Sequence, residues 1–196
     1  MQKLKCFILG MFCLLAVSGL FQLTGCGSVS MHADYPFYSN EQSLIDKADL
    51  IITGEVVKVN KAEKINIKSD RTSQGTNEDE KILYTVSEIK VVDVMKGNVK
   101  VGDIIKVKQL GDKNGAAEAS LAKYDGYFKE KSQYVLFLSV YENPDSPFET
   151  LNPEQGQINI KDGKTKVNEI NTLFKSGIPK DEFVAELKAK IDSKSK

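Results

Sequence analysis

The cysteine at position 26 has the clearest potential for covalent chemistry in this 196-residue sequence. It directly follows Leu23-Thr24-Gly25, and Gly25 is small enough to let a peptidase cleave the bond before Cys26. A thiol is a soft nucleophile that can be alkylated, whereas a serine hydroxyl at the same position would react much more weakly. Cys26 is therefore the best candidate in the sequence for a covalent modification.

The stretch before this cysteine has the three parts of a secretory signal peptide. Lys3 and Lys5 give a positive start, residues 6–21 form an uncharged and mostly apolar run, and small residues follow. As a helix, that run would be about 24 Å long, short of the ~30 Å hydrocarbon core of a bilayer. We therefore expect cleavage before Cys26. The alternatives are ordinary cleavage further on, after residues 28–30, and an uncleaved anchor helix.

Leu23-Thr24-Gly25-Cys26 after such a run resembles the lipobox of bacterial lipoproteins. The resemblance implies that residues 1–25 are a lipoprotein signal peptide, removed by signal peptidase II between Gly25 and Cys26. It also implies that Cys26 carries a diacylglyceryl group and palmitate. The expected location is the bacterial cell membrane, with the chain anchored by lipid and facing the extracytoplasmic side. The membrane would then be a partner through the N-terminal lipid.

The cysteine count is consistent with that reading. Of the three cysteines, Cys6 and Cys13 lie inside the apolar run, so the mature chain would keep Cys26 alone. Exported domains often contain disulfides, but this one could form none within itself. We expect the fold to be stabilised by core packing.

No group of residues has the types and spacing of a catalytic site. His32 is the only histidine, and it lies in a small, polar segment, residues 27–37, without suitable neighbours. Catalysis would have to use carboxylates such as Glu55, Glu88 and Asp93, two of which would need to lie within about 10 Å in a cleft. We expect no enzymatic activity and no cofactor. A carboxylate-based cell-envelope enzyme is the alternative.

Metal and nucleic-acid binding are also disfavoured. A calcium-loop pattern begins at Asp70, but Lys81 occupies the position where a bidentate glutamate is needed. The 27 basic side chains are balanced by 27 acidic ones, and Arg71 is the only arginine. Surfaces that bind nucleic acid depend on an excess of basic residues and on arginine. We therefore expect neither a metal site nor a nucleic-acid partner.

The first half of the mature chain predicts a short helix and two strands. Ser39 and Gln42 have the spacing of a capping box, which predicts a helix of about two turns. Residues 49–59 have the pattern of a strand, and Gly54 within them indicates a bulge. Residues 81–95 predict a long strand whose hydrophobic phase slips, so we expect bulges or strong coiling. Long, bent strands are typical of small closed barrels.

The second half predicts more strands and a final helix. Residues 134–141 are the most apolar stretch of the mature chain, so we expect a central strand covered on both faces. Asp162-Gly163 predicts a tight hairpin turn. The chain ends in an amphipathic helix whose apolar face contains Phe183, Val184, Leu187 and Ile191. The other expected strands are residues 104–108, 148–151, 157–160 and 164–167.

The predicted organisation is one mostly β domain with six or seven strands, a short helix before them and a helix after. Residues 27–37 and 60–80 lack core-forming periodicity, so we expect a solvated tether and a long, mobile hairpin connection. The boundaries are therefore a signal peptide at 1–25, a lipidated N-terminus and flexible tether at 26–38, and a single β-barrel domain at 39–196.

Several strings within residues 48–140 are similar to the netrin-module and metalloproteinase-inhibitor type of OB barrel, and to bacterial lipoproteins with such domains. The resemblance implies a small, partly closed, antiparallel OB-like barrel. Most of these positions are core positions, so they indicate a fold rather than a function. The inhibitors of that family use a free N-terminal cysteine, which lipid on Cys26 would block. The strings are Ala48-Asp49-Leu50-Ile51-Ile52-Thr53-Gly54-Glu55-Val56, Tyr84-Thr85-Val86 with Val94-Met95-Lys96-Gly97, and Tyr134-Val135-Leu136-Phe137-Leu138.

The expected function is binding or interaction at the membrane surface, without catalysis, and an envelope protein is one candidate partner. An exposed aromatic patch would support it, and the candidates are Tyr124, Tyr127 and Phe128. Besides the enzyme, a passive structural envelope lipoprotein is an alternative.

Overall fold

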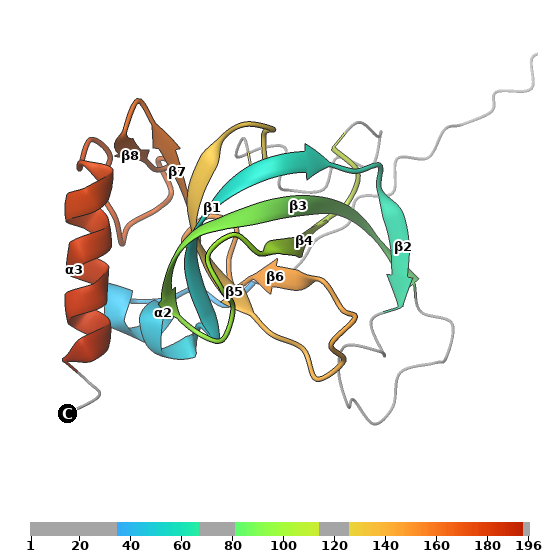
Figure 1. Ribbon diagram of the computed structural model, residues 1–196, viewed down its shortest axis with the longest axis horizontal. Helices are drawn as coiled ribbons and strands as arrows, with labels where there is room; N and C mark the ends of the chain where they lie inside the picture. Colours follow the sequence, from blue (N-terminus) through green and yellow to red (C-terminus); the bar gives the residue numbers. More distant parts are fainter. Residues whose placement is uncertain (1–34, 67–80, 114–125, 194–196) are drawn as a thin grey trace, which may run out of the picture.

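The computed structural model describes residues 35–66, 81–113 and 126–193, which form two helices and an eight-stranded sheet (Figure 1). The helices are α2 (Glu41–Lys47) and α3 (Lys180–Asp192). The strands are β1 (Leu50–Val59), β2 (Glu63–Asn66), β3 (Lys81–Lys96), β4 (Ile104–Leu110), β5 (Gln133–Ser139), β6 (Phe148–Thr150), β7 (Gln157–Lys161) and β8 (Lys164–Lys166).

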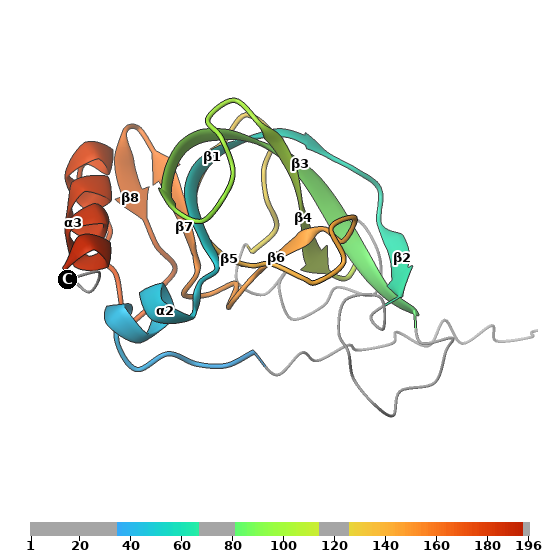
Figure 2. The ribbon, with the colours of Figure 1, turned by 60° about the horizontal axis from the view of Figure 1, so that its bottom comes forward.

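Five strands close into a barrel. They pair in the order β1-β3-β4-β6-β5, and β5 pairs with β1 again to complete the ring, which Figure 2 shows end on. Strands β4 and β6 are parallel, and the other pairings are antiparallel. The sheet continues from β5 to β7 and β8, while β2 pairs with β3. The predicted small, mostly β, OB-like barrel is confirmed.

Bulges in β1 and β3 allow these long strands to curl. Their pairing shifts register at three places, and one of them lies between Thr53 and Gly54. A Cβ atom at position 54 would overlap Cγ2 of Ile89, so only glycine permits this close approach of the two strands. The bulge expected at Gly54 and the phase slips expected in residues 81–95 are both confirmed.

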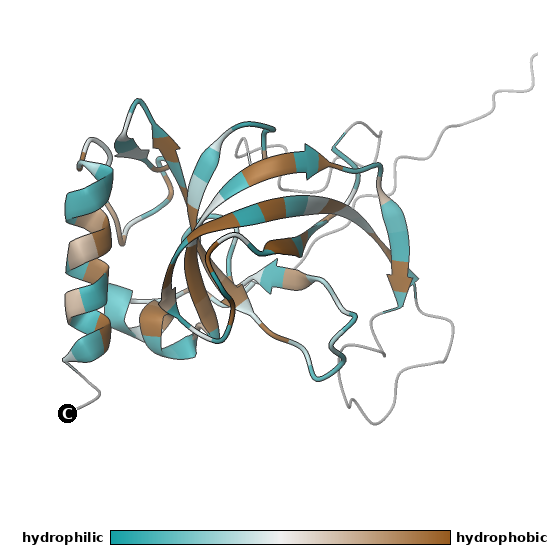
Figure 3. Cartoon of the chain, viewed as in Figure 1, coloured by the Kyte–Doolittle hydropathy of each residue, from teal (hydrophilic) through white to brown (hydrophobic). Residues whose placement is uncertain are grey.

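Strand β5 separates two hydrophobic clusters. Leu136 is fully buried in the cluster that fills the barrel, whereas Phe137 is buried in a second cluster between the sheet and the helices. In Figure 3 the apolar colour is concentrated on β1 and β5, where these strands run together. The prediction of a central strand covered on both faces is confirmed.

Both predicted helices are present. The cap of α2 is Asn40 rather than Ser39, because the Asn40 side chain accepts a hydrogen bond of 2.8 Å from the Ser43 backbone N–H. Helix α3 buries Phe183 and Leu187 in the second cluster, as its pattern predicted. Neither of these two helices has the length and hydropathy that a membrane crossing requires.

Residues 35–38 are part of the domain, which corrects the expected extent of the flexible tether. The backbone N–H and C=O of Tyr38 bond to the Gln155 side chain at 2.8 and 2.9 Å, and Asn152 donates to the Pro36 carbonyl at 3.1 Å. Tyr38 is only 8% exposed. We call residues 35–38 the N-terminal strap. Residues 26–34 lie outside the described ranges.

Strand β2 corrects a second expectation. Residues 63–66 pair with residues 81–84 of β3, and Ile65 packs against Tyr84 and Leu110. The solvated connection expected at residues 60–80 is therefore wrong for this stretch, which supplies the eighth strand. Residues 67–80 lie outside the described ranges.

Candidate functional site

The β7–β8 hairpin presents one polar face and one buried face. Asp162 and Gly163 have φ angles of 52° and 72°, which form the predicted tight turn. Asn159 lies opposite Lys166, and Lys161 lies opposite Lys164. Because residues directly opposite each other share a face, all four of these side chains point to the same side of the sheet. The other side packs into the cluster covered by α3.

The polar face continues onto the barrel. Tyr134 of β5 lies opposite Asn159 of β7, so Tyr134, Asn159 and Lys166 form one row across three strands. Gln157 lies two residues before Asn159 on the same face and opposite Leu136. The hairpin face and the barrel interior are thus one continuous surface.

An open groove of about 1320 Å³ runs beside this surface (β7 and β8 in Figure 1). Gln157, Asn159 and Tyr134 line it, and we call them its floor. We call Lys161 and Lys166 of the hairpin one wall, and the lining residues between 126 and 133 the other. The lining also includes the carboxylates of Glu55, Asp162, Glu169 and Asp181. Pockets for small ligands are typically about 300–1,000 Å³. The volume and the open shape suit a segment of a chain better than a small cofactor.

Hydrogen bonds hold the floor of the groove in place. Gln157 donates to the Gly126 carbonyl at 2.8 Å and accepts from the buried Gln109 side chain at 2.9 Å. Gln109 in turn accepts from the Phe128 backbone N–H at 2.9 Å. These side chains are ordered before any ligand arrives, which lowers the entropy cost of binding.

Tyr134 places a hydroxyl group at the floor while its ring remains in the core. The ring packs edge-on against Phe128 with 5.1 Å between centroids, and the hydroxyl oxygen accepts from the Lys129 backbone N–H at 3.2 Å. Burial raises the pKa of Tyr134. The phenol therefore stays protonated and uncharged at neutral pH.

The second wall is fixed to the barrel by backbone hydrogen bonds. The Lys131 N–H donates to the Val56 carbonyl at 2.8 Å, and the Val56 N–H donates to the Ser132 carbonyl at 3.0 Å. Lys131 has a φ of 64°, a left-handed conformation that costs a lysine about 1–2 kcal/mol. This wall is therefore a fixed part of the barrel surface.

The aromatic patch expected from the sequence does not form as predicted. Phe128 is 2% exposed and belongs to the barrel core, and its backbone N–H is bonded to the buried Gln109 side chain. Tyr127 is half-buried and donates to the Leu110 carbonyl at 2.6 Å. Tyr124 lies outside the described ranges. The polar groove lies beside Phe128, whose ring packs against the groove residue Tyr134.

The three candidate carboxylates have different surroundings. Glu55 lies opposite Lys90 of β3 and lines the groove. Glu88 accepts from the Asn60 side chain at 3.3 Å, and Asp93 forms an ion pair of 2.8 Å with Lys188 of α3. Of these carboxylates, Glu55 alone lines the groove.

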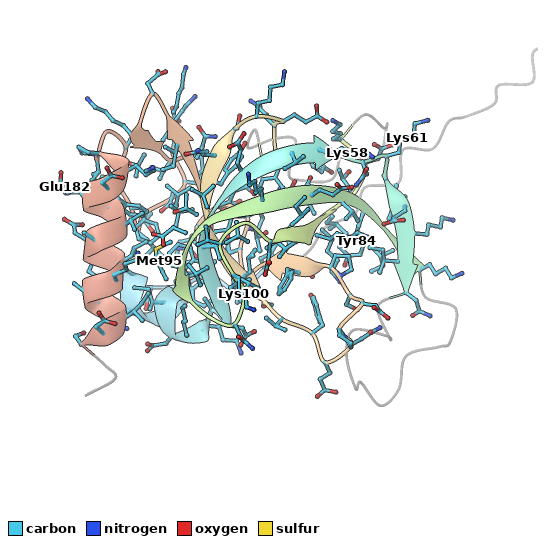
Figure 4. The ribbon with its side chains drawn as sticks, viewed as in Figure 1. Lys58, Lys61, Tyr84, Met95, Lys100 and Glu182 are labelled. Atoms are coloured by element: carbon cyan, nitrogen blue, oxygen red, sulfur yellow. The ribbon has the colours of Figure 1, made fainter. Side chains whose placement is uncertain are left out.

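A buried lysine, Lys108 of β4, contacts Tyr84 of β3 and Glu149 of β6, and we call this group the buried lysine cluster (Tyr84 in Figure 4). Lys108 is 1% exposed, and its Nζ lies 3.9 Å from a Glu149 carboxylate oxygen. The ammonium group also lies 5.0 and 4.2 Å from the ring centroids of Tyr84 and Tyr141, within range of cation–π attraction. The Tyr141 hydroxyl donates to Glu149. Alternation in residues 104–108 indicates a solvent-facing lysine, so this cluster could not be predicted from the local pattern.

The N-terminal strap packs against this cluster. Burial raises the pKa of Tyr35 well above its usual value, and the negative charge of Glu149 raises it further. The Tyr35 hydroxyl also has a hydrogen bond with Glu149. The cluster therefore ties the strap to the barrel.

The remaining sequence predictions concern covalent and metal chemistry. Gly25, Cys26 and His32 lie outside the described ranges, so cleavage and lipidation stay predictions. Among the residues that the structure describes, no group of three or more His, Cys, Asp or Glu side chains is placed to hold a metal ion.

The hairpin lysines had a sequence signal that could have been used. The tight turn at Asp162-Gly163 fixes the register, and that register places residues 161, 164 and 166 on one face.

Comparison with known proteins gives no further guidance, because no protein-family model matches the chain and no curated protein matches it either.

Proposed function

We propose that this chain is a lipid-anchored binding protein on the extracytoplasmic side of a bacterial cell membrane, without catalytic activity. The observation that carries the proposal is Leu23-Thr24-Gly25-Cys26 after the apolar run of residues 6–21. Signal peptidase II would cleave between Gly25 and Cys26, and the Cys26 sulfur would carry the lipid.

The position of the N-terminal strap implies that only a short segment would connect the lipid on Cys26 to the barrel. Tyr35 comes nine positions after Cys26 in the sequence, and that length of chain spans at most about 30 Å. Hydrogen bonds between Tyr38 and Gln155 fix the other end of this connection to the barrel. An anchored barrel would therefore stay close to the bilayer surface.

The groove supports the binding part of the proposal. Its floor is polar and held by hydrogen bonds, and its lining contains both lysines and carboxylates. Such a surface can select a ligand without a nucleophile or a general base. OB-like barrels commonly use their loops and strand faces for binding.

The test of the anchor is a cysteine substitution with a matched control. Cys26→Ser should leave an unprocessed, unlipidated precursor, because the hydroxyl is too weak a nucleophile for lipid transfer. Cys13→Ser changes a thiol within the apolar run and should be processed like the wild type. Mass spectrometry of the membrane fraction should find a diacylglyceryl group on Cys26 in the wild type and in Cys13→Ser. An unmodified wild-type N-terminus, for instance at Met31, would contradict the proposal.

A further inference from the structure

The hairpin face concentrates positive charge where it destabilises the fold. Lys161 and Lys164 lie directly opposite each other beside the turn, and Lys166 lies two residues further along the same face. Like charges in such cross-strand positions repel each other. In the part of the chain that the structure describes, none of these three lysines forms an ion pair with a carboxylate. An anion bound to this face would reduce the repulsion.

The carboxylates that line the groove are Glu55, Asp162, Glu169 and Asp181, and they balance part of the lysine charge. Asp181 pairs with Lys180 at 3.6 Å. Glu55 lies opposite Gln133, and Gln133 lies opposite Ile160, so Glu55 belongs to the opposite face of the sheet from the hairpin lysines. The hairpin itself carries Lys161, Lys164 and Lys166 against one carboxylate, Asp162 in the turn, so it has a local excess of positive charge.

We propose that the groove binds an anionic, hydroxyl-rich chain such as a polyol phosphate. Its phosphates are held by the lysine face, which we define as Lys161, Lys164 and Lys166, and its hydroxyl groups bond to the polar floor. Lysine binds phosphate as a point charge, so a face of lysines can hold the phosphates of such a chain. This inference names a ligand class for the binding function proposed above, but it does not depend on the lipid anchor.

A soluble chain fits the groove better than the surface of a bilayer does. The floor residues Gln157 and Asn159 are half-buried between the two walls. A flat layer of lipid headgroups would contact the lysines on the rim and leave these amides unused. A flexible chain can enter the groove and contact both.

The test compares two triple variants of the full-length protein purified in detergent. One is Lys161→Gln/Lys164→Gln/Lys166→Gln. The matched control, Lys47→Gln/Lys100→Gln/Lys106→Gln, removes the same charge from exposed lysines that do not line the groove (Lys100 in Figure 4). Affinity for poly(glycerol phosphate) should fall about tenfold in the hairpin variant and less than about twofold in the control. Neutral dextran should bind to neither.

Thermal unfolding separates loss of binding from loss of folding. The hairpin variant should unfold at the same temperature as the wild type or higher, because the cross-strand repulsion is removed. Equal losses of affinity in both variants would overturn the proposal, since they would indicate general attraction to positive charge. Binding to phosphatidylglycerol vesicles that depends on the hairpin lysines, with no binding of the polymer, would also overturn it. The lipid state of Cys26, read by mass spectrometry of the same samples, tests the anchor separately.

Discussion

At the residue scale, Lys108 has the least common environment among the described charged side chains. Its side chain is 1% exposed. It contacts the carboxylate of Glu149, whose side chain is 14% exposed, and the rings of two tyrosines. Lys108→Met keeps most of the side-chain volume but leaves the glutamate without its cation. Removing one partner of a buried ion pair is costly, so we expect a loss of about 2–3 kcal/mol in the free energy of unfolding. Chemical denaturation measures it.

Lys106 provides the matched control on the same strand. It lies two residues before Lys108 and is exposed, so Lys106→Met should change stability by less than about 0.5 kcal/mol. The double variant Lys108→Met/Glu149→Gln should recover more than half of the loss, because neither charge is left alone. Equal effects of Lys106→Met and Lys108→Met would show that the ion pair contributes little.

Tyr35 should make the stability of the domain depend on alkaline pH. Burial, and then the charge of Glu149, hold its pKa above the value of about 10 that an unfolded tyrosine has. Below about pH 10 both states keep the proton, so this contribution to stability is fully present. Above it the unfolded chain loses the proton first, and stability falls until the pH reaches the folded pKa. Urea unfolding from about pH 8 to about pH 11 should show a steeper fall for the wild type than for Tyr35→Phe. Parallel curves would exclude this role of Tyr35.

At the element scale, β5 should contribute more to stability than any surface strand, because its two faces belong to two clusters. Leu136 is fully buried in the barrel cluster. Leu136→Ala should therefore lower the free energy of unfolding by about 2–5 kcal/mol. Val140 follows the strand and is 51% exposed, so Val140→Ala serves as the control with an expected effect below about 0.5 kcal/mol. A change under about 1 kcal/mol for Leu136→Ala would mean that the core can close over the missing atoms.

The elements that the sequence predicted correctly are those whose signals are local. The turn at Asp162-Gly163 needs only the positive φ of two adjacent residues, and the apolar run in β5 needs only its own composition. The cap of α2 was misplaced by one residue because Ser39 and Asn40 are both good caps. β2 and the parallel pairing of β4 with β6 depend on partners far away in the sequence.

In the candidate site, too, the local features could be predicted from the sequence and the contacts between distant segments could not. The sequence contained the hairpin and its lysines, but the floor of the groove is assembled from Gln109, Tyr134 and Gln157, which lie on three different strands. Lys108 alternates with core residues like a surface lysine, and Tyr141 and Glu149 come to it from later in the chain. The spacing of residues within one segment cannot predict contacts between residues of different segments.

At the scale of the whole molecule, the strap decides where the domain begins. Residues 35–38 bond to Gln155 and Asn152, more than a hundred residues away, and Tyr35 packs beside Glu149. We therefore expect a chain that starts at residue 39 to be less stable than one that starts at residue 35. The loss should be about 2–4 kcal/mol, from one buried tyrosine and several hydrogen bonds.

The full-length protein allows the same point to be tested without truncation. Tyr38→Ala removes a side chain that is 8% exposed, whereas Phe37→Ala removes a neighbour that is 60% exposed. The first should lower the free energy of unfolding by about 2 kcal/mol, and the second by less than about 0.5 kcal/mol. Urea denaturation of both variants decides between a docked strap and a free tether. If Tyr38→Ala is as stable as Phe37→Ala, the domain begins at α2 and the strap contributes little to its stability.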